Sequence, residues 1–276
     1  MSRGYITIAQ NSEDIDYLEM SYALALSLKA TQENNNLCVC VDEETKKLIT
    51  DKHKKVFDAI VDIPWNDDAK GDKWKIHNKW KYPHMTPYDE TIILDSDMIF
   101  TESVDYWWDY LAKKDVWCCT NVKTFRNEDV TSDYYRKKFT QLNLPNVYSN
   151  FTYFNKSELT FEFFRMVELI MVHWNVYFDK FLAGVGQNWM SADVAYALAI
   201  QLLDIEAETC DYDIKDVPTF VHMKSMVQNV PANMIESNWT KSITSELGDD
   251  LQVKIGNFTQ TLPVHYVEKN WMNDHK

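Results

Sequence analysis

The first 60 residues alternate between short apolar runs and segments with a helical pattern. Three runs have the length and apolar character of buried strands, at residues 5–9, 37–41 and 59–61. Asn11 is expected to cap a helix between the first two runs, and a second helix is expected over residues 43–57. The first of these helices carries apolar residues at helical spacing: Tyr17, Met20, Leu24 and Leu28. This order of elements predicts a parallel sheet with right-handed crossovers.

The rest of the chain continues the mixed pattern. Further strands are expected at residues 91–94, 116–120, 147–155, 219–222 and 264–266. A long apolar helix is expected from Leu159 to Leu182, and another, capped by Ser191, is expected to run to Leu203. The apolar stripe of the long helix is expected to be core, and it consists of Phe161, Phe164, Val167 and Met171. No repeat or low-complexity linker is present, so residues 1–276 are predicted to form a single α/β domain with a loop-rich C-terminal extension.

Composition removes several classes of protein. The 276 residues include 28 Lys and Arg against 42 Asp and Glu, and the resulting net charge of −14 argues against nonspecific binding to nucleic acids or anionic membranes. Only six glycines are present, and the absence of G-x-G-x-x-G and G-x-x-x-x-G-K disfavours a Rossmann dehydrogenase or a P-loop NTPase. The five cysteines lack C-x-x-C spacing and are expected to be buried and reduced. Neither a signal peptide nor a membrane-spanning run is seen, so we expect a cytoplasmic protein, in the host cytoplasm if it is viral.

The most informative motif is Asp95-Ser96-Asp97, directly after the apolar run of residues 91–94. In open α/β sheets, ligands bind beyond the carboxyl ends of the strands. Two carboxylates one residue apart can both reach a hard cation, which keeps coordination positions free for a diphosphate. A D-x-D sequence often occurs by chance in a solvated turn, but its place after a buried strand favours a metal site.

With this motif in this place, the chain resembles the metal-dependent glycosyltransferases of the GT-A fold. In layout it is most similar to the glycogenin-like family 8 enzymes and related bacteriophage transferases. The resemblance covers most of residues 3–205, plus the tail, and its matching segments are as follows. Residues 5–9 and 22–28 resemble the nucleotide-binding first strand and helix of the family. Residues 75–79 resemble its lysine-bearing helix, and residues 88–97 resemble its metal-binding strand. Residues 148–155 resemble the segment that usually reads fNsGv.

The resemblance implies a GT-A-type, Rossmann-like mixed sheet flanked by helices. Residues from about 1 to 125 would form the nucleotide-sugar-binding half, and residues from about 126 to 276 the acceptor-binding half and the C-terminal tail. Asp193 falls where the family places an acidic residue against the donor sugar. The resemblance also implies transfer with retention of anomeric configuration, which the D-x-D motif by itself does not decide.

The sequence departs from the family pattern at two places. Asn150 is followed by Phe151 instead of a glycine, and the terminal H-x-x-G-x-x-K-P-W pattern is replaced by residues 265–271, which lack the glycine and carry Lys269 two positions early. We expect His265 to be the third metal ligand, because it lies on the last strand candidate, with His222 as the alternative. A hydrogen-bonded strand histidine is the competing interpretation for either residue.

The remaining site residues have expected roles beside ordinary structural ones. Asp193 and Gln187 are the catalytic candidates that orient the donor, although Asp193 also suits a helix N-terminus and Gln187 a solvated loop. Lys75 and Lys79, four residues apart, are expected either to neutralise a diphosphate from one helical face or to form an exposed lysine face. The full set expected to bind the donor is Ala9, Gln10, Tyr17, Lys75, Lys79, Ser96, Asn150 and Lys269, with Lys224 as an alternative to Lys269.

The function predicted from these residues is transfer of a sugar from a nucleoside-diphosphate sugar, most simply a UDP-sugar, with Mn²⁺ or Mg²⁺ held by Asp95, Asp97 and His265. A nucleotidyltransferase is disfavoured because residues 9–12 lack the glycine-rich basic loop. A catalytically inactive glycan-binding module is the alternative from another class.

The acceptor is predicted from one segment that runs against the acidic balance. It carries Lys70, Lys73, Lys75, Lys79 and Lys81 among tryptophans just ahead of the metal strand, and residues 134–138 could extend it. The resemblance to bacteriophage transferases implies a hydroxymethylated pyrimidine in DNA as one candidate acceptor, and such a basic, aromatic patch would suit a DNA strand with an extruded base. The alternatives are a glycan or a small-molecule acceptor, with the lysines serving the diphosphate or solvating a loop.

Overall fold

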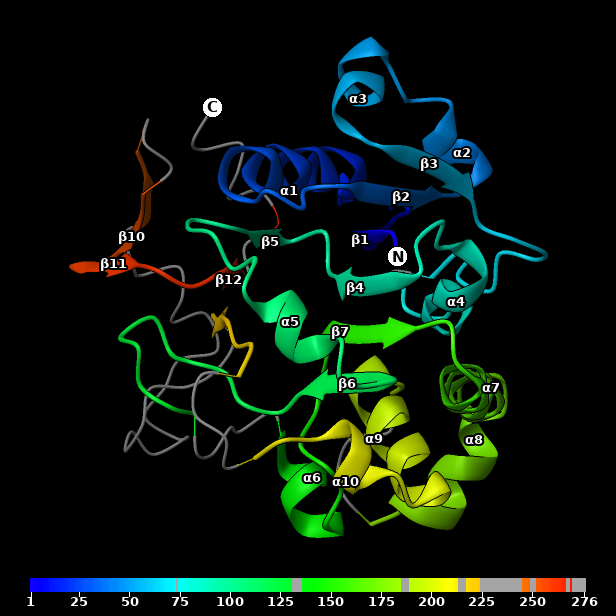
Figure 1. Ribbon diagram of the computed structural model, residues 1–276. Coiled ribbons are helices and arrows are strands. Elements are labelled where there is room, and N and C mark those ends of the chain that lie inside the picture. Colours follow the sequence, from blue (N-terminus) through cyan, green and yellow to red (C-terminus); the bar gives the residue numbers. More distant parts are fainter. Residues whose placement is uncertain are drawn as a thin grey trace.

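The computed structural model describes residues 1–72, 74–130, 136–184, 189–212, 217–223, 245–248, 252–266 and 269. Its centre is a six-stranded sheet in the order β3-β2-β1-β4-β7-β6 (Figure 1). The strands are β1 (Arg3–Ala9), β2 (Leu37–Val41), β3 (Ala59–Asp62), β4 (Glu90–Leu94), β6 (Val116–Cys119) and β7 (Tyr148–Asn155). The first four run parallel, and β7 is antiparallel to both β4 and β6. The predicted class, a mixed α/β sheet flanked by helices, is therefore confirmed.

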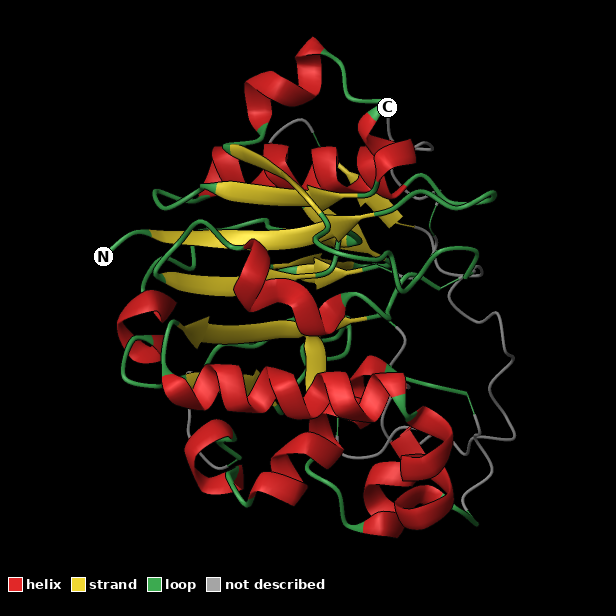
Figure 2. Ribbon diagram, turned by 90° about the vertical axis from the view of Figure 1, so that its right-hand side faces the viewer, coloured by secondary structure: helices red, strands yellow, loops and turns green. Residues whose placement is uncertain are grey.

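Helices cover both faces of this sheet (Figures 1 and 2). They are α1 (Tyr17–Thr31), α2 (Glu43–Lys46), α3 (Asp51–Val56), the 3₁₀ turn η1 (Lys79–Lys81), α4 (Tyr82–Met85), α5 (Trp107–Leu111), α6 (Lys137–Leu142), α7 (Glu158–Val172), α8 (Trp174–Tyr177), the π-helical turn η3 (Phe178–Leu182), α9 (Ala192–Leu203) and α10 (Glu206–Thr209). Ser191 occupies the N-cap position of α9, as predicted.

Three helical predictions were wrong in detail. Asp16 caps α1 by accepting from the Glu19 N–H, while Asn11 reaches the same helix end by accepting from the Leu18 N–H. The helix expected over residues 43–57 is split, because Thr50 starts α3 with a capping box. The helix expected over 159–182 is interrupted at His173, which leaves helical geometry (φ −109°, ψ 35°) ahead of residues of low helix propensity; the shorter turns α8 and η3 then continue to Leu182.

The sheet is buried on both sides because its strands are apolar at consecutive positions. Alternate residues point to opposite faces, so Ile6 and Ile93 join a cluster with α7 and α9, whereas Tyr5 and Ile92 join a cluster with α1 and α5. All five cysteines are buried and free, as predicted. Phe161 contradicts the expected core stripe, because it lies at the margin of the buried face of α7 and is 43% exposed.

The C-terminal part, expected to be rich in loops, contributes short strands to two small sheets. One sheet has the order β5 (Met98–Ile99), β12 (Val264–His265), β8 (Val221–His222), and the other β11 (Phe258–Gln260), β10 (Val253–Ile255), β9 (Ser245–Leu247). The first sheet joins the segment after β4 to the end of the chain. Within the described ranges, none of the helices has the length and apolar character needed to cross a membrane.

Candidate active site

The D-x-D motif lies at the carboxyl end of β4, in the middle of the central sheet. The Asp95 N–H donates to the Asn150 carbonyl at 3.2 Å, which extends the pairing of β4 with β7 by one residue. The Asp97 carbonyl accepts from the Tyr266 N–H at 3.1 Å. The backbone is therefore fixed on both sides of the motif, and the two carboxylates are held in place by strands.

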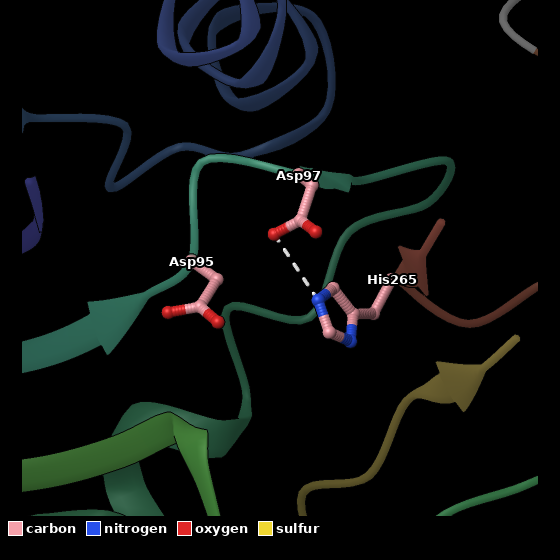
Figure 3. A group of neighbouring side chains, drawn as sticks. All are labelled: Asp95, Asp97 and His265. Carbon is pink, nitrogen blue, oxygen red and sulfur yellow. Dashed lines mark ion pairs between the residues drawn. The ribbon is translucent and has the colours of Figure 1, made fainter. Parts of the chain in front are cut away.

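His265 reaches the motif through the small sheet. It is in register with Met98 on the antiparallel strand β5, and with His222 on the parallel strand β8. Because Met98 follows Asp97 directly, this pairing brings the imidazole to the carboxylate, with Nε2 3.1 Å from Asp97 Oδ1 (Figure 3). A histidine 170 positions away in number (Asp95 to His265) thus joins the D-x-D motif through one short strand.

The residues present fit a divalent cation. One ligand atom each from Asp95, Asp97 and His265 lie within 4.8 Å of one another. The His265 ring is buried, and neither ring nitrogen is hydrogen-bonded to any residue in the described part of the chain; the short contact with Asp97 lacks hydrogen-bond alignment. A buried imidazole without hydrogen bonds beside two carboxylates is costly unless something else binds there. Two carboxylates and one imidazole suit Mn²⁺ and its neighbours.

Two lysines neutralise the pair of carboxylates. Lys79 in η1 donates from Nζ to Asp95 Oδ1 at 2.6 Å, and its side chain is only 9% exposed. Lys269 contacts Asp97 in the same way. The two ammonium groups come from residues 190 positions apart in the sequence (79 to 269) and converge on the two carboxylates of one motif. A cation bound at the cluster would release both lysines to face an anionic ligand.

Tyr17, at the start of α1, is also close to the motif. Burial, together with the negative charges of Asp97 and Asp95, raises the pKa of the Tyr17 phenol far above its ordinary value. The phenol therefore keeps its proton throughout the physiological range, and it can donate a hydrogen bond to a ligand at the cluster.

Asp193, in the first turn of α9, is held by two partners. Its Oδ2 pairs with Arg136 Nη1 at 2.5 Å, and its Oδ1 accepts from the Ser149 N–H and hydroxyl at 2.9 and 2.6 Å. Burial alone would raise the pKa of this carboxyl, but Arg136, the Ser149 hydrogen bonds and the charge of Lys79 together hold it below its ordinary value. Asp193 is therefore a carboxylate at neutral pH.

The first two donor-binding candidates, Ala9 and Gln10, are completely buried at the end of β1. The Gln10 amide donates to Asp42 Oδ2 and Asp67 Oδ1, and it accepts from Asn78 Nδ2. Gln10 thus acts as a bridge that fixes two carboxylates at the carboxyl edge of the sheet.

Sequence reasoning missed these carboxylates, although Asp42 follows a buried strand in the same way as Asp95. Burial would raise the pKa of Asp67, but hydrogen bonds from Asn78, Gln10 and the Ala69 N–H, and the charge of Lys75, lower it below its ordinary value. Arg136 was also missed as the partner of Asp193, because 57 positions separate them.

The remaining candidates are placed as follows. Ser96, the middle residue of the motif, is buried, and so is Asn150 beside it, whose side chain faces the Met98 sulfur. Lys75 turns to the Ala69 carbonyl and is not part of a helix, so the expected helical face with Lys79 does not form. His222 is stacked on His265 with ring centroids 5.1 Å apart. Gln187 and Lys224 lie outside the described residues.

Three lysines of the expected basic patch and its extension are buried, namely Lys79, Lys81 and Lys138. Lys81 is 1% exposed and is bonded to Asn78, Asp68 and the Asn66 carbonyl, and Lys79 is bonded to Asp95. Lys138, in the proposed extension of the patch, is buried against Trp174 and Phe178. The sequence pattern cannot show these partners, so it did not reveal that these three lysines are enclosed, whereas Lys70 is exposed.

Comparisons with known proteins give a likeness in structure only. The chain matches no protein-family model and no curated protein. It resembles the structure of mouse xyloside xylosyltransferase 1 (TM-score 0.49, 11% identity, 76% of this chain and 84% of that chain). It also resembles the structure of the galactosyltransferase LgtC in complex with donor and acceptor sugar analogues (TM-score 0.46, 14% identity, 71% of this chain and 70% of that chain). A third similar structure is core-mannan synthase A from Aspergillus fumigatus in a Mn/GDP form (TM-score 0.42, 12% identity, 80% of this chain and 73% of that chain).

Proposed function

We propose that the protein is a metal-dependent glycosyltransferase that moves a sugar from a nucleoside-diphosphate sugar to a hydroxyl acceptor. The observation that carries this proposal is the cluster of Asp95, Asp97 and His265, whose ligand atoms lie within 4.8 Å of one another at the carboxyl edge of the sheet. A buried lysine, Lys79, and a partly buried one, Lys269, lie beside the divalent-cation site and suit a diphosphate, because cation and lysines together can balance its charge.

A divalent cation held by this cluster would coordinate the diphosphate and stabilise the charge that develops as the sugar leaves. In the proposed reaction, the bond between the sugar C1 and the diphosphate oxygen breaks and a bond from C1 to the acceptor oxygen forms. The acceptor proton passes to the released diphosphate. Lys79 and Lys269 would move from Asp95 and Asp97 to the phosphate oxygens, so each lysine supplies a charge-assisted hydrogen bond to the leaving group.

Asp193 and Tyr17 supply complementary hydrogen-bonding groups. Asp193 is ionised and 26% exposed at its side chain, so it can accept from a donor-sugar hydroxyl while Arg136 and Ser149 hold it. The protonated phenol of Tyr17 can donate to the nucleotide. We further propose retention of configuration, which rests on the sequence resemblance alone.

The acceptor is proposed to be a hydroxyl of a glycan or a small molecule. The hypothesis of a modified DNA acceptor depended on the lysine-rich segment before β4. Lys79 and Lys81 of that segment are buried and bonded to carboxylates, which withholds these two cations from a phosphate backbone. The net charge of −14 also argues against binding of DNA.

The test is a thermal-shift panel of UDP-, GDP- and dTDP-sugars with Mn²⁺, Mg²⁺ or EDTA, followed by an assay of nucleotide release. We expect at least one donor to stabilise the protein only when metal is present, and the same donor to be hydrolysed slowly without an acceptor. Asp95→Asn and Asp97→Asn should abolish both effects, whereas Asp109→Asn, whose side chain is 88% exposed on α5, should not. Turnover retained in both site variants would remove the cluster from the mechanism.

The same assay separates an enzyme from an inactive glycan-binding module. A module of that kind would bind sugars without metal-dependent release of nucleotide, and Asp95→Asn would leave its binding unchanged.

A further inference from the structure

Four aromatic rings from three separate segments form a continuous surface on one side of the central sheet; we call it the aromatic platform. Trp65 follows β3, Trp80 and His84 lie in η1 and α4, and Phe161 lies in the first turn of α7. Figure 1 shows α4 and α7 on the same side of the molecule, and Figure 2 turns this side towards the viewer. The platform therefore consists of residues that are distant in the sequence but adjacent in the folded protein.

The rings are arranged as a stack with an edge. Trp65 and Trp80 are almost parallel, with centroids 5.7 Å apart and an interplanar angle of 7°. The His84 ring meets Trp65 edge-on at 5.0 Å, and it contacts Phe161 at 5.9 Å. Trp65 and Phe161, the outer members, are 67% and 43% exposed. The platform thus presents two large apolar surfaces to solvent with an imidazole between them.

Its base is fixed by polar contacts. Trp80 is nearly buried, and its Nε1 donates to Asp68 Oδ2 at 3.2 Å. The Lys81 ammonium lies 5.2 Å from the Trp80 ring centroid and pairs with the same carboxylate at 3.0 Å. The exposed Trp65 ring therefore stacks on an indole that is anchored by a hydrogen bond and a cation–π contact. A rigid aromatic ring loses little freedom when a ligand binds.

Trp65 combines exposure with an unfavourable backbone. Its φ of 61° lies in the left-handed region, which bulky side chains rarely adopt. The ring also remains mostly in water, so burial of Trp65 does not compensate for the strain. Strain that is retained at an exposed bulky residue points to a binding role for that residue.

We propose that the aromatic platform is a binding site for a neutral carbohydrate chain. A flat, fixed indole ring packs well against the C–H face of a pyranose, and the imidazole of His84 and nearby carboxylates can bond to sugar hydroxyls. Asp68 is paired with Lys81, and the charge of Lys75 acts on Asp67, so the two carboxylates beside the platform are balanced by lysines. An uncharged polyol suits such a balanced surface, whereas the net charge of −14 on the whole chain disfavours a nucleic-acid backbone or an anionic membrane.

The site is distinct from the metal cluster but connected to it. Trp80 follows Lys79 in η1, and Lys79 donates to Asp95. A carbohydrate chain bound on the platform would therefore be held by the protein at a second place, outside the metal cluster. The inference does not depend on the proposed transferase activity, since it uses none of the metal ligands.

The experiment is isothermal titration of the full-length protein with four neutral hexasaccharides: α-1,4-glucose, β-1,4-glucose, β-1,4-N-acetylglucosamine and α-1,6-mannose. We expect saturable binding of at least one of them. Trp65→Ala should weaken this binding at least tenfold, and Phe161→Ala should weaken it less. Tyr106→Ala removes another exposed ring (63% exposed) on the N-terminal side of α5 and should leave the affinity unchanged.

Trp65→Gly provides a check on folding, because glycine accepts a positive φ; its melting temperature should not fall below that of the wild type. The proposal is overturned if none of the hexasaccharides binds, or if Trp65→Ala binds as tightly as the wild type. It is also overturned if sedimentation shows a wild-type dimer that Trp65→Ala dissociates, since a second copy would then cover the platform. Binding without nucleotide release would keep this inference and remove the transferase.

Discussion

Replacing either of the two stacked histidines by alanine separates a metal ligand from a structural residue. His265 and His222 are neighbours in register, both are buried, and their ring centroids are 5.1 Å apart. Each replacement should therefore create a similar cavity and lower the melting temperature in EDTA by a similar amount. Only His265→Ala should also reduce the stabilisation that Mn²⁺ provides, because only His265 shares the cluster with Asp95 and Asp97.

The size of this effect follows from linkage. At a Mn²⁺ concentration of 100 times the wild-type dissociation constant, binding stabilises the folded state by about 2.7 kcal/mol. For a chain of this length, that corresponds to a rise in melting temperature of roughly 5 °C, at about 2 °C per kcal/mol. Loss of an outer-shell partner typically weakens metal binding by about 10–100-fold, so loss of one of three direct ligands is expected to weaken it by at least about 100-fold. The same Mn²⁺ concentration then stabilises by at most about 0.4 kcal/mol, or roughly 1 °C.

The assay is differential scanning fluorimetry of the wild type and both variants, each with Mn²⁺ and with EDTA. The quantity compared is the shift between the two conditions, so the different baselines of the variants cancel. A full 5 °C shift in His265→Ala, with a reduced shift in His222→Ala, would refute the assignment and give the ligand role to His222. Reduced shifts of equal size would refute the distinction between the two residues.

Three further predictions concern stability and reactivity. Asp193→Asn should destabilise the protein by about 2 kcal/mol at pH 7, because it removes charged hydrogen bonds to Arg136 and Ser149. The folded-state pKa of Asp193 is lowered, so its contribution to the free energy of unfolding is present above the ordinary pKa of about 3.9 and disappears as the pH falls through the folded-state value. Urea titrations of the wild type and the variant should therefore show a smaller difference in the free energy of unfolding at pH 3 than at pH 7. Gly4→Ala should cost about 1–3 kcal/mol in urea denaturation and leave the Mn²⁺ shift unchanged, because a Cβ there would collide with the Tyr88 ring; an unaltered midpoint would contradict this contact. Burial raises the pKa of the Cys210 thiol to about 11, so the native protein should resist a thiol reagent at pH 8 that labels all five cysteines after denaturation; rapid native labelling would be the contrary result.

The elements that could be predicted most reliably from the sequence were those whose residues satisfy one dominant requirement, such as burial on both faces. Strands such as β2 are apolar at every position because both faces are covered, and a run of this length and character is typical of a buried strand. The D-x-D motif was recognisable for the same reason, since two carboxylates directly after a buried strand stand out. Asp42 obeys this rule as well, after β2, and it could have been found with the same signal.

What the sequence could not show were partners that depend on three-dimensional contact. Lys81 looks like a solvated cation in a basic segment, but the fold encloses it between Asp68 and Asn78. The end of α7 likewise depends on a competition between propensity and packing that an apolar pattern does not resolve. Trp65 gave no signal in the sequence, because its importance lies in a backbone angle and in the ring beneath it.

The most direct test of the central claim is to locate a bound cation. Crystals grown with Mn²⁺ and UDP or GDP, whichever stabilises the protein more, would be measured at the manganese absorption edge. We predict one strong anomalous peak in contact with Asp95, Asp97 and His265 and with the diphosphate oxygens, while Lys79 and Lys269 turn from the carboxylates to the phosphates. A bound nucleotide without an anomalous peak at this cluster, or with manganese coordinated elsewhere, would contradict the account.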